Sequence, residues 1–317
     1  MAQITYILCP GQGAQVVGMG KDYYEASPAA REVFEAANDA LGFDLKSLCF
    51  DGPEEELNQT NISQPAIYVT SVACFRAAVS VGIVNPAEVT AYAGLSLGEY
   101  TALHLGGSFS FLDGLKLVQA RGTYMQEAAV ATPSGMVAIM GADESAVAKL
   151  CDEVAQGEVL VPANYNAPGQ IIVSGANAAC ERFVKAAEPA GFRVVPLKVA
   201  GAFHSPLMQS GADRMAVELD RVALRQPEKT VYANVTAQPH GDVASMKKLL
   251  IEQIVSPVRW EQTMQMLVAG GEARYVELAP GRVLTGLLKK INRRLPVESL
   301  ASAEALGNKQ KAVSSKQ

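Results

Sequence analysis

The segment Gly94-Leu95-Ser96-Leu97-Gly98 has the spacing of a nucleophilic serine. In the pattern G-x-S-x-G, the serine lies on a tight turn between a strand and a helix, and side chains in place of the glycines would clash. The turn strains the serine backbone and exposes its hydroxyl at a helix N-terminus, which favours a developing negative charge. The same five residues also fit a plain glycine-rich turn with a helix-capping serine.

A nucleophilic serine needs a general base, and the sequence contains three histidines. His104 lies about two helical turns after Ser96 and is expected to point away from it. His240 lies between a proline and a glycine, which predicts an exposed position in a turn. His204 follows a predicted strand and precedes a predicted helix, so it is the candidate base by elimination, although alone it would fit a structural histidine. No aspartate has the spacing of a third member, but a backbone carbonyl can hold the imidazole tautomer equally well.

Two more features bear on the same chemistry. The segment Pro10-Gly-Gln-Gly-Ala-Gln15 lacks the third glycine of a dinucleotide-binding loop, because position 16 is valine, and no P-loop lysine follows. It fits a loop whose backbone N–H groups face an oxyanion, or an ordinary tight turn. Arg121 fits a clamp on a substrate carboxylate, or a solvated residue at a helix end. The sequence has no HExxH motif and its cysteines lack ligand spacing, so no metal site is expected.

The elements that must position these residues follow from the spacing of apolar residues. Short apolar runs that end at glycine turns predict buried strands at 4–8 and 89–93. Helical spacing predicts helices at 27–40, 64–81, 99–105 and 111–130, the first with Ser27 as its N-cap and Pro28 as its first residue. Beyond residue 200 the pattern predicts helices at 205–219, 246–254, 260–269 and 283–291 and strands at 231–234 and 273–278.

The stretch between these two regions has a different pattern. It predicts strands at 135–140, 159–164, 170–174 and 193–198 and helices at 144–154 and 177–190. The order β-α-β-β-α-β is typical of a ferredoxin-like unit. The sequence therefore predicts a discontinuous α/β domain over 1–131 and 200–300, an inserted small domain over 132–199, and a flexible polar tail over 301–317. A cleft between two such domains is a preferred ligand site.

Composition narrows the classes of partner. Of 317 residues, 49% are hydrophobic and 19% charged, and the net charge is −5, which argues against nucleic acid or an anionic membrane as the main partner. No uncharged apolar run reaches about 18 residues, and the N-terminus lacks the basic region of a signal peptide, so no membrane span is expected. Five scattered cysteines predict reduced thiols in a cytoplasmic protein: Cys9, Cys49, Cys74, Cys151 and Cys180.

Together these motifs resemble the malonyl-CoA:acyl-carrier-protein transacylase family, including the free-standing acyltransferases of polyketide assembly lines. The resemblance runs from about residue 4 to 295, and its specificity comes from the ordered set rather than from any one motif. The set comprises Pro10–Gln15, Gln64-Pro65, Gly94–Glu99, Gln119–Gly122, Asn164–Gln170, Gly201–Pro206, Gln253 with Ser256-Pro257, and Pro280–Gly286. The resemblance implies an α/β-hydrolase-like large domain with an inserted ferredoxin-like small domain, and a monomer that needs no cofactor or metal.

The resemblance also implies a role for each site residue. Ser96 would take the malonyl group from malonyl-CoA, with His204 as its base. The carbonyl of Gln253 would orient the base, and the backbone N–H groups of Gln12 and Leu97 would form the oxyanion hole. Arg121 would hold the malonyl carboxylate. Phe203 and Asn164 would contact the substrate. The ring of Phe203 would leave little room for an α-methyl branch on the acyl group.

The implied reaction is ping-pong acyl transfer to the phosphopantetheine thiol of an acyl carrier protein. A neutral acetyl group would leave Arg121 unpaired in the pocket, so malonyl is the expected acyl group. Two alternatives stay open: an acyl hydrolase that passes the group to water, and a silent module that only binds carrier protein.

One residue departs from the family pattern. Leu95 precedes the serine where the family usually has histidine, a feature similar to the polyketide acyltransferases, so fatty-acid and polyketide pathways both stay open. A basic cluster fits either a docking site for an acidic carrier protein or a solvated helix end: Lys289, Lys290, Arg293 and Arg294.

Overall fold

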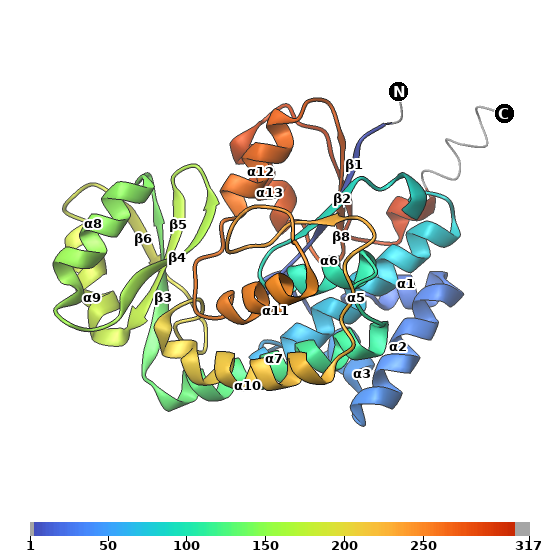
Figure 1. The fold of residues 1–317 in the computed structure, drawn as a ribbon, viewed down its shortest axis with the longest axis horizontal. Coiled ribbons are helices and arrows are strands. Elements are labelled where there is room, and N and C mark those ends of the chain that lie inside the picture. The colour runs from blue at the N-terminus through green and yellow to red at the C-terminus, as the bar shows by residue number, and fades with distance from the viewer. Residues whose placement is uncertain (1–2, 308–317) are drawn as a thin grey trace.

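The central sheet of the large part has five parallel strands in the order β7-β2-β1-β8-β9. The computed structural model describes residues 3–307 of the chain, and Figure 1 shows this sheet on the right, surrounded by helices. Every residue of β1 is buried, as expected for a strand covered on both faces. The strands are β1 (Thr5–Cys9), β2 (Ala91–Gly94), β7 (Thr230–Val231), β8 (Arg274–Leu278) and β9 (Val297–Leu300).

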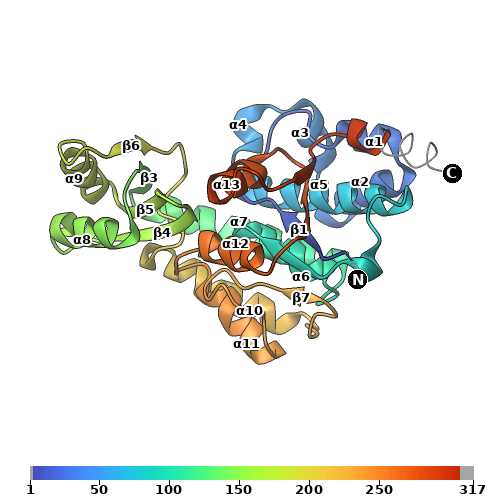
Figure 2. The same ribbon diagram turned by 90° about the horizontal axis from the view of Figure 1, so that it is seen from above.

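Helices cover both faces of this sheet (Figures 1 and 2). They are α1 (Lys21–Ala26), α2 (Pro28–Leu41), α3 (Leu45–Asp51), α4 (Glu54–Leu57), α5 (Thr60–Ser80), α6 (Leu97–Leu105), α7 (Phe111–Ala131), α10 (Gln209–Arg221), α11 (Val243–Glu252), α12 (Trp260–Ala269) and α13 (Val283–Ile291), with 3-10 turns at Pro86–Glu88 and Pro206–Met208. Side chains of β1 alternate between two cores. Ile7 and Cys9 pack into the core that includes α2, α5 and α7, whereas Tyr6 and Leu8 pack into the core that includes α12 and α13.

A separate antiparallel sheet, at the left of Figure 1, has the strand order β4-β5-β3-β6. One face packs against α8 and α9 around Val137, Val173 and Phe183. The other face contributes Met136 and Ile172 to a core of the large part. The elements are β3 (Ser134–Met140), α8 (Glu144–Ala155), β4 (Leu160–Ala167), β5 (Gln170–Ala176), α9 (Asn177–Ala187) and β6 (Arg193–Pro196). The chain is thus a mixed α/β protein with one parallel and one antiparallel sheet.

Strand β4 connects the small sheet to the large part. The N–H of Tyr165 donates to the carbonyl oxygen of Val258 and the N–H of Val258 donates to that of Ala163, both at 2.9 Å. Helix α12 begins directly afterwards with Trp260, the only tryptophan of the sequence, which is buried in the same core as Ala167 of β4. Backbone pairing and side-chain packing therefore hold the two parts together at this point.

The structure departs from the sequence predictions at several element ends. Helix α5 begins at Thr60, so Pro65 lies inside the helix rather than at its start. The helix predicted at 205–219 begins with a 3-10 turn, because the Ser205 hydroxyl accepts the N–H of Leu207. Strand β7 stops at Val231, three residues earlier than predicted. The sequence does not predict α1, α3, α4 or β9, because such short elements carry too few residues to show a period.

The end of the described chain packs onto the large part. Within the predicted flexible tail, Leu306 is buried and the N–H of Ala303 donates to the carboxylate of Asp22. Residues 301–307 are therefore held by specific contacts, contrary to the prediction for this stretch. Residues 308–317 of the predicted tail lie outside the described residues.

Candidate active site

Ser96 lies on the tight turn between β2 and α6. Its backbone has φ 51° and ψ −105°, a left-handed conformation that is strained for a residue with a side chain. A Cβ at Gly94 would lie 1.9 Å from the carbonyl of Gly98, and one at Gly98 would lie 2.1 Å from the carbonyl oxygen of Cys9. The turn therefore requires both glycines, as the motif predicts. The Ser96 side chain makes no capping hydrogen bond to α6, which excludes the alternative of a capping serine.

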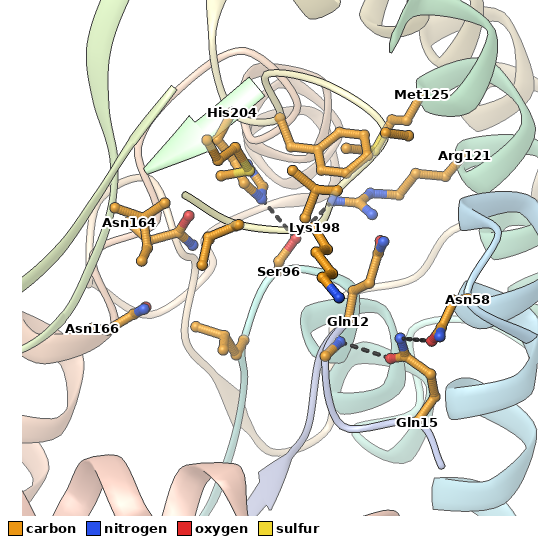
Figure 3. Close-up of a pocket in the computed structure, with 18 of the residues that line it drawn as sticks. Gln12, Gln15, Asn58, Ser96, Arg121, Met125, Asn164, Asn166, Lys198 and His204 are labelled. Atoms are coloured by element: carbon orange, nitrogen blue, oxygen red, sulfur yellow. Dashed lines mark hydrogen bonds between the residues drawn. The ribbon is translucent and has the colours of Figure 1, made fainter. Parts of the chain in front are cut away.

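The Ser96 hydroxyl lies between a histidine and an arginine (Figure 3). Its Oγ is 2.8 Å from His204 Nε2 and accepts a hydrogen bond of 3.0 Å from Arg121 Nη2. His204 Nδ1 is 2.7 Å from the carbonyl oxygen of Gln253. A carbonyl only accepts, so Nδ1 carries the proton and Nε2 is left to accept one from Ser96. This geometry would allow Ser96 to act as a nucleophile, with His204 as its base and the carbonyl of Gln253 orienting the base.

The surroundings of His204 favour the neutral imidazole. Burial and the positive charge of Arg121 lower its pKa to about 4, although the carbonyl of Gln253 opposes the shift. The imidazole is therefore unprotonated at neutral pH and can accept a proton. Like Ser96, His204 has a positive φ, 58°, so both residues of the pair occupy left-handed backbone positions.

Arg121 projects from α7 into the same site and is only 1% exposed. Its guanidinium donates to three neutral oxygens: Ser96 Oγ, Gln64 Oε1 at 2.8 Å and Gln253 Oε1 at 2.8 Å. Its Nε has no hydrogen-bond partner within the described residues. Burial lowers the pKa of the guanidinium from its ordinary value. The alternative of a solvated helix-end arginine is therefore wrong, and the residue is a buried cation that an anionic ligand would complement.

These residues line a cavity of about 780 Å³. The large part and the segment after β6 contribute Gln12, Leu95, Ser96, Arg121, Lys198, Phe203 and His204, and the small sheet contributes Met136, Asn164, Asn166 and Ile172. Leu97 is completely buried in the first turn of α6, so its backbone N–H is the only group that it could direct toward a ligand. The sequence analysis missed Asn166 and Lys198, although Asn166 lies inside the segment 164–170.

A buried polar cluster supports the serine turn from behind. The carboxylate of Glu99 accepts hydrogen bonds from the His240 ring, the backbone of Asn234 and the side chain of Gln253. The prediction of an exposed His240 is wrong, because its ring is buried against Glu99. Sequence reasoning missed Glu99 and Asn234, and the one available signal was a charged residue within the apolar stretch 91–103.

The other candidates lie away from the serine. His104 Nδ1 is 3.1 Å from the carbonyl oxygen of Phe109, as expected for a residue that points elsewhere. The four residues of the basic cluster, Lys289, Lys290, Arg293 and Arg294, are exposed at the end of α13.

Three chain-wide features complete the description. All five cysteines are buried free thiols. Across residues 3–307, no helix combines the length and hydrophobicity needed to cross a bilayer. The same residues contain no cluster of three or more histidine, cysteine or acidic side chains suited to a metal ion.

Comparison with known proteins assigns the chain to a family. The sequence profile described as "Acyl transferase domain" matches residues 5–316. The chain is 40% identical to the malonyl CoA-acyl carrier protein transacylase of Bacillus subtilis, over 96% of each protein, and 40% identical to that of Salmonella typhimurium, over 96% of this chain and 98% of the relative.

The solved structure of the transacylase from Coxiella burnetii superposes with a TM-score of 0.93 at 35% identity, over 98% of both chains. A malonyl-transacylase solved in complex with its type II PKS acyl-carrier protein superposes with a TM-score of 0.92 at 36% identity, over 98% of this chain and 99% of that one. A profile match over residues 5–316, together with relatives 40% identical over nearly the whole chain, shows that the protein belongs to the acyl transferase domain family.

Proposed function

We propose that this chain transfers the malonyl group of malonyl-CoA to the phosphopantetheine thiol of an acyl carrier protein through a malonyl ester of Ser96. The observation that carries the proposal is the position of the Ser96 hydroxyl, 2.8 Å from the His204 base and 3.0 Å from Arg121. This places the nucleophile directly beside a cation that can bind an acyl carboxylate. Relatives about 40% identical over nearly the whole chain carry the name of this activity.

In the first half-reaction, Ser96 Oγ attacks the thioester carbonyl while its proton passes to His204 Nε2. The C–S bond then breaks, and the proton on Nε2 goes to the departing sulfur of coenzyme A. The carbonyl oxygen of Gln253 accepts the hydrogen bond from Nδ1–H throughout and stabilises the imidazolium.

In the second half-reaction, the carrier thiol gives its proton to His204 and attacks the ester, and Ser96 leaves with that proton. Both tetrahedral intermediates carry a negative oxygen. The backbone N–H groups of Gln12 and Leu97 are the proposed donors to it. Leu97 is the first residue of α6, so its N–H has no acceptor within the helix, and Gln12 lines the cavity next to Ser96 (Figure 3).

The proposed acyl selectivity rests on Arg121. The malonyl carboxylate would give this buried cation an ionic partner, whereas an acetyl group would leave it with neutral oxygens only. The side chains of Phe203 and Asn164 line the same cavity and are the proposed contacts that limit the size of the acyl group.

Two other functions fit this site less well than malonyl transfer does. A hydrolase for neutral acyl chains would gain nothing from the buried charge of Arg121. A module that only binds carrier protein would not need Ser96 and His204 in hydrogen-bond contact.

We also propose the identity of the two domains, the location of the protein and its oligomeric state. The strand order of the small sheet and its β-α-β-β-α-β sequence support a ferredoxin-like insert over 132–199. The parallel sheet with its strand–serine–helix turn supports an α/β-hydrolase-like domain over 1–131 and 200–300. Five buried free thiols suit a cytoplasmic protein, and a monomer is the proposed state, which gel filtration would test.

The intact mass of the protein after brief incubation with malonyl-CoA tests the proposal. We expect the wild type to gain one malonyl group and to lose it when carrier protein is added, and we expect Ser96→Ala to gain none. Release of free coenzyme A without a modified protein would instead favour the hydrolase. An unmodified protein with no release of coenzyme A would contradict both enzymatic readings.

A further inference from the structure

Glu99 is a carboxylate buried completely behind the serine turn, and it is hydrogen-bonded to neither the Ser96 hydroxyl nor the His204 ring. Its Oε2 accepts from the backbone N–H of Asn234 at 2.9 Å and from Gln253 Nε2 at 2.7 Å, and its Oε1 is 2.8 Å from His240 Nε2. A buried charge is costly unless donors surround it, and three donors surround this one. Hydrogen bonds from three groups therefore offset the burial of this carboxylate.

His240 contributes one of these donors. Its Nδ1 is buried and has no hydrogen-bond partner within the described residues, so a second proton on the ring would have no acceptor. The geometry thus favours a proton on Nε2, which donates to Glu99.

The side-chain amide of Gln253 lies between Glu99 and Arg121. A carboxylate only accepts and a guanidinium only donates, so the amide must turn its NH₂ group to Glu99 and its oxygen to Arg121. The distances agree: Nε2 to Glu99 Oε2 is 2.7 Å, and Oε1 to Arg121 Nη2 is 2.8 Å. Glu99 is therefore the nearest of the acceptors that keep the NH₂ end of the amide away from the arginine, and it does so without touching the arginine itself.

The same cluster holds the backbone of the nucleophile. Asn234 Oδ1 accepts the N–H of Ser96 at 2.6 Å, and Gln253 Nε2 donates to the Ser96 carbonyl at 3.0 Å. Asn234 Nδ2 donates to the carbonyl of Gly94 at 2.7 Å. A strained residue keeps its conformation only where its surroundings enforce it, and both enforcing residues are bonded to Glu99.

We infer that Glu99, held by His240, is a positioning residue that sets the selectivity for anionic acyl groups, because it fixes the polarity of the Gln253 amide and through it the place of Arg121. This inference rests on the proposed malonyl transfer. With Glu99→Gln, the side chain at 99 can offer either an oxygen or an NH₂ group. The NH₂ group of Gln253 then loses its nearest obligate acceptor, at 2.7 Å, and keeps the Ser96 carbonyl at 3.0 Å. The amide is held less firmly, so it can reverse, turn its NH₂ group toward Arg121 and displace the guanidinium from the acyl carboxylate.

The test compares the acylation of wild type and Glu99→Gln by malonyl-CoA and by acetyl-CoA. We expect the ratio of kcat/KM for malonyl over acetyl to fall by about ten-fold, the size of one charge-assisted hydrogen bond. Glu277→Gln is the matched control, because Glu277 is equally buried but caps the N-terminus of α13 through Leu284 and Thr285, away from the cavity. Its ratio should equal that of the wild type.

A double-mutant cycle separates positioning from a general loss of structure. In an Arg121→Met background, adding Glu99→Gln should leave the malonyl-to-acetyl ratio unchanged, because the residue through which Glu99 acts is gone. If Glu99→Gln lowers both kcat/KM values by the same factor, Glu99 only supports the fold and the inference is overturned.

A second variant keeps the test decisive if Glu99→Gln does not fold. His240→Phe leaves the carboxylate in place but removes one of its donors, and a drop of about three-fold in the ratio is expected. An unchanged ratio in a folded His240→Phe would overturn the inference in that case. A wild type that takes up no malonyl group would contradict the proposed function first, which separates the two failures.

Discussion

The two walls of the cavity differ in how their polar groups are held. On the wall built by the large part, Ser96, Arg121 and His204 each contact at least one other residue of the site by a hydrogen bond. On the wall built by the small sheet, Met136 and Ile172 are apolar and the Asn166 side-chain oxygen has no partner within the described residues. The hydrogen-bonded groups proposed to react thus lie on one wall, while the other wall adds apolar side chains and an amide oxygen that is unpaired within the described residues. Substitutions on the two walls should accordingly differ in kind as well as in size.

The largest effect is expected at the base. His204→Ala should lower the rate of Ser96 acylation by about 10²–10⁴-fold, the usual contribution of a positioned general base. Stopped-flow measurement of coenzyme A release would give this rate. His104→Ala is the control, since His104 contacts Phe109 and not the serine. Equal losses of the acylation rate in the two variants would mean that His204 does not act as the base.

The next effect is expected at the buried cation. Arg121→Met should lower kcat/KM for malonyl-CoA by about 100-fold, while the value for acetyl-CoA stays level or rises. Competition between the two thioesters, read by intact mass, measures the change directly. The exposed Arg214, paired with Glu127 on the surface, provides the control Arg214→Met, which should leave the preference intact. A preserved malonyl preference in Arg121→Met would place carboxylate recognition elsewhere in the cavity.

The pH dependence should show the buried position of the base. Because the pKa of His204 is lowered to about 4, acylation should stay level as pH falls through 6.5 and decline only near pH 4. Part of this shift comes from Arg121, so Arg121→Met should move the acid limb to higher pH. Between pH 6.5 and 4 the unfolded chain binds a proton at this histidine that the folded chain does not, so folding stability should fall as pH falls through this window. A wild-type limb near pH 6.5 would show that the imidazole is solvated.

The smallest effect is expected on the small sheet. Asn164→Ala should raise KM for malonyl-CoA by less than about ten-fold and leave kcat nearly unchanged, because no reacting group depends on this side chain. Steady-state kinetics would separate the two constants. Arg193→Ala, on the exposed strand β6, is the control for a general change in this sheet. A large loss of kcat in Asn164→Ala would mean that the small sheet takes part in the chemistry.

The same contrast explains what the sequence could predict. The Ser96 motif and the helices α2, α7, α12 and α13 follow from local spacing, and the structure places them close to the predicted bounds. Contacts between distant segments do not follow from spacing. Glu99 meets Asn234 and His240 only after the chain has folded back over more than a hundred residues, so the burial of His240 was not predictable from its proline–glycine context. Gln253 was identified through a family resemblance, and its amide contacts with Glu99 and Arg121 required the structure.

The position of Trp260 makes the docking of the small sheet observable by light. Trp260 is the only tryptophan of the chain, and it is buried. It lies two residues after Val258, whose backbone is hydrogen-bonded to β4. Its emission spectrum therefore reports on the core that α12 shares with β4. An undocked sheet would expose the ring and shift its fluorescence to the red. A single intrinsic fluorophore can thus follow movement of a whole cavity wall.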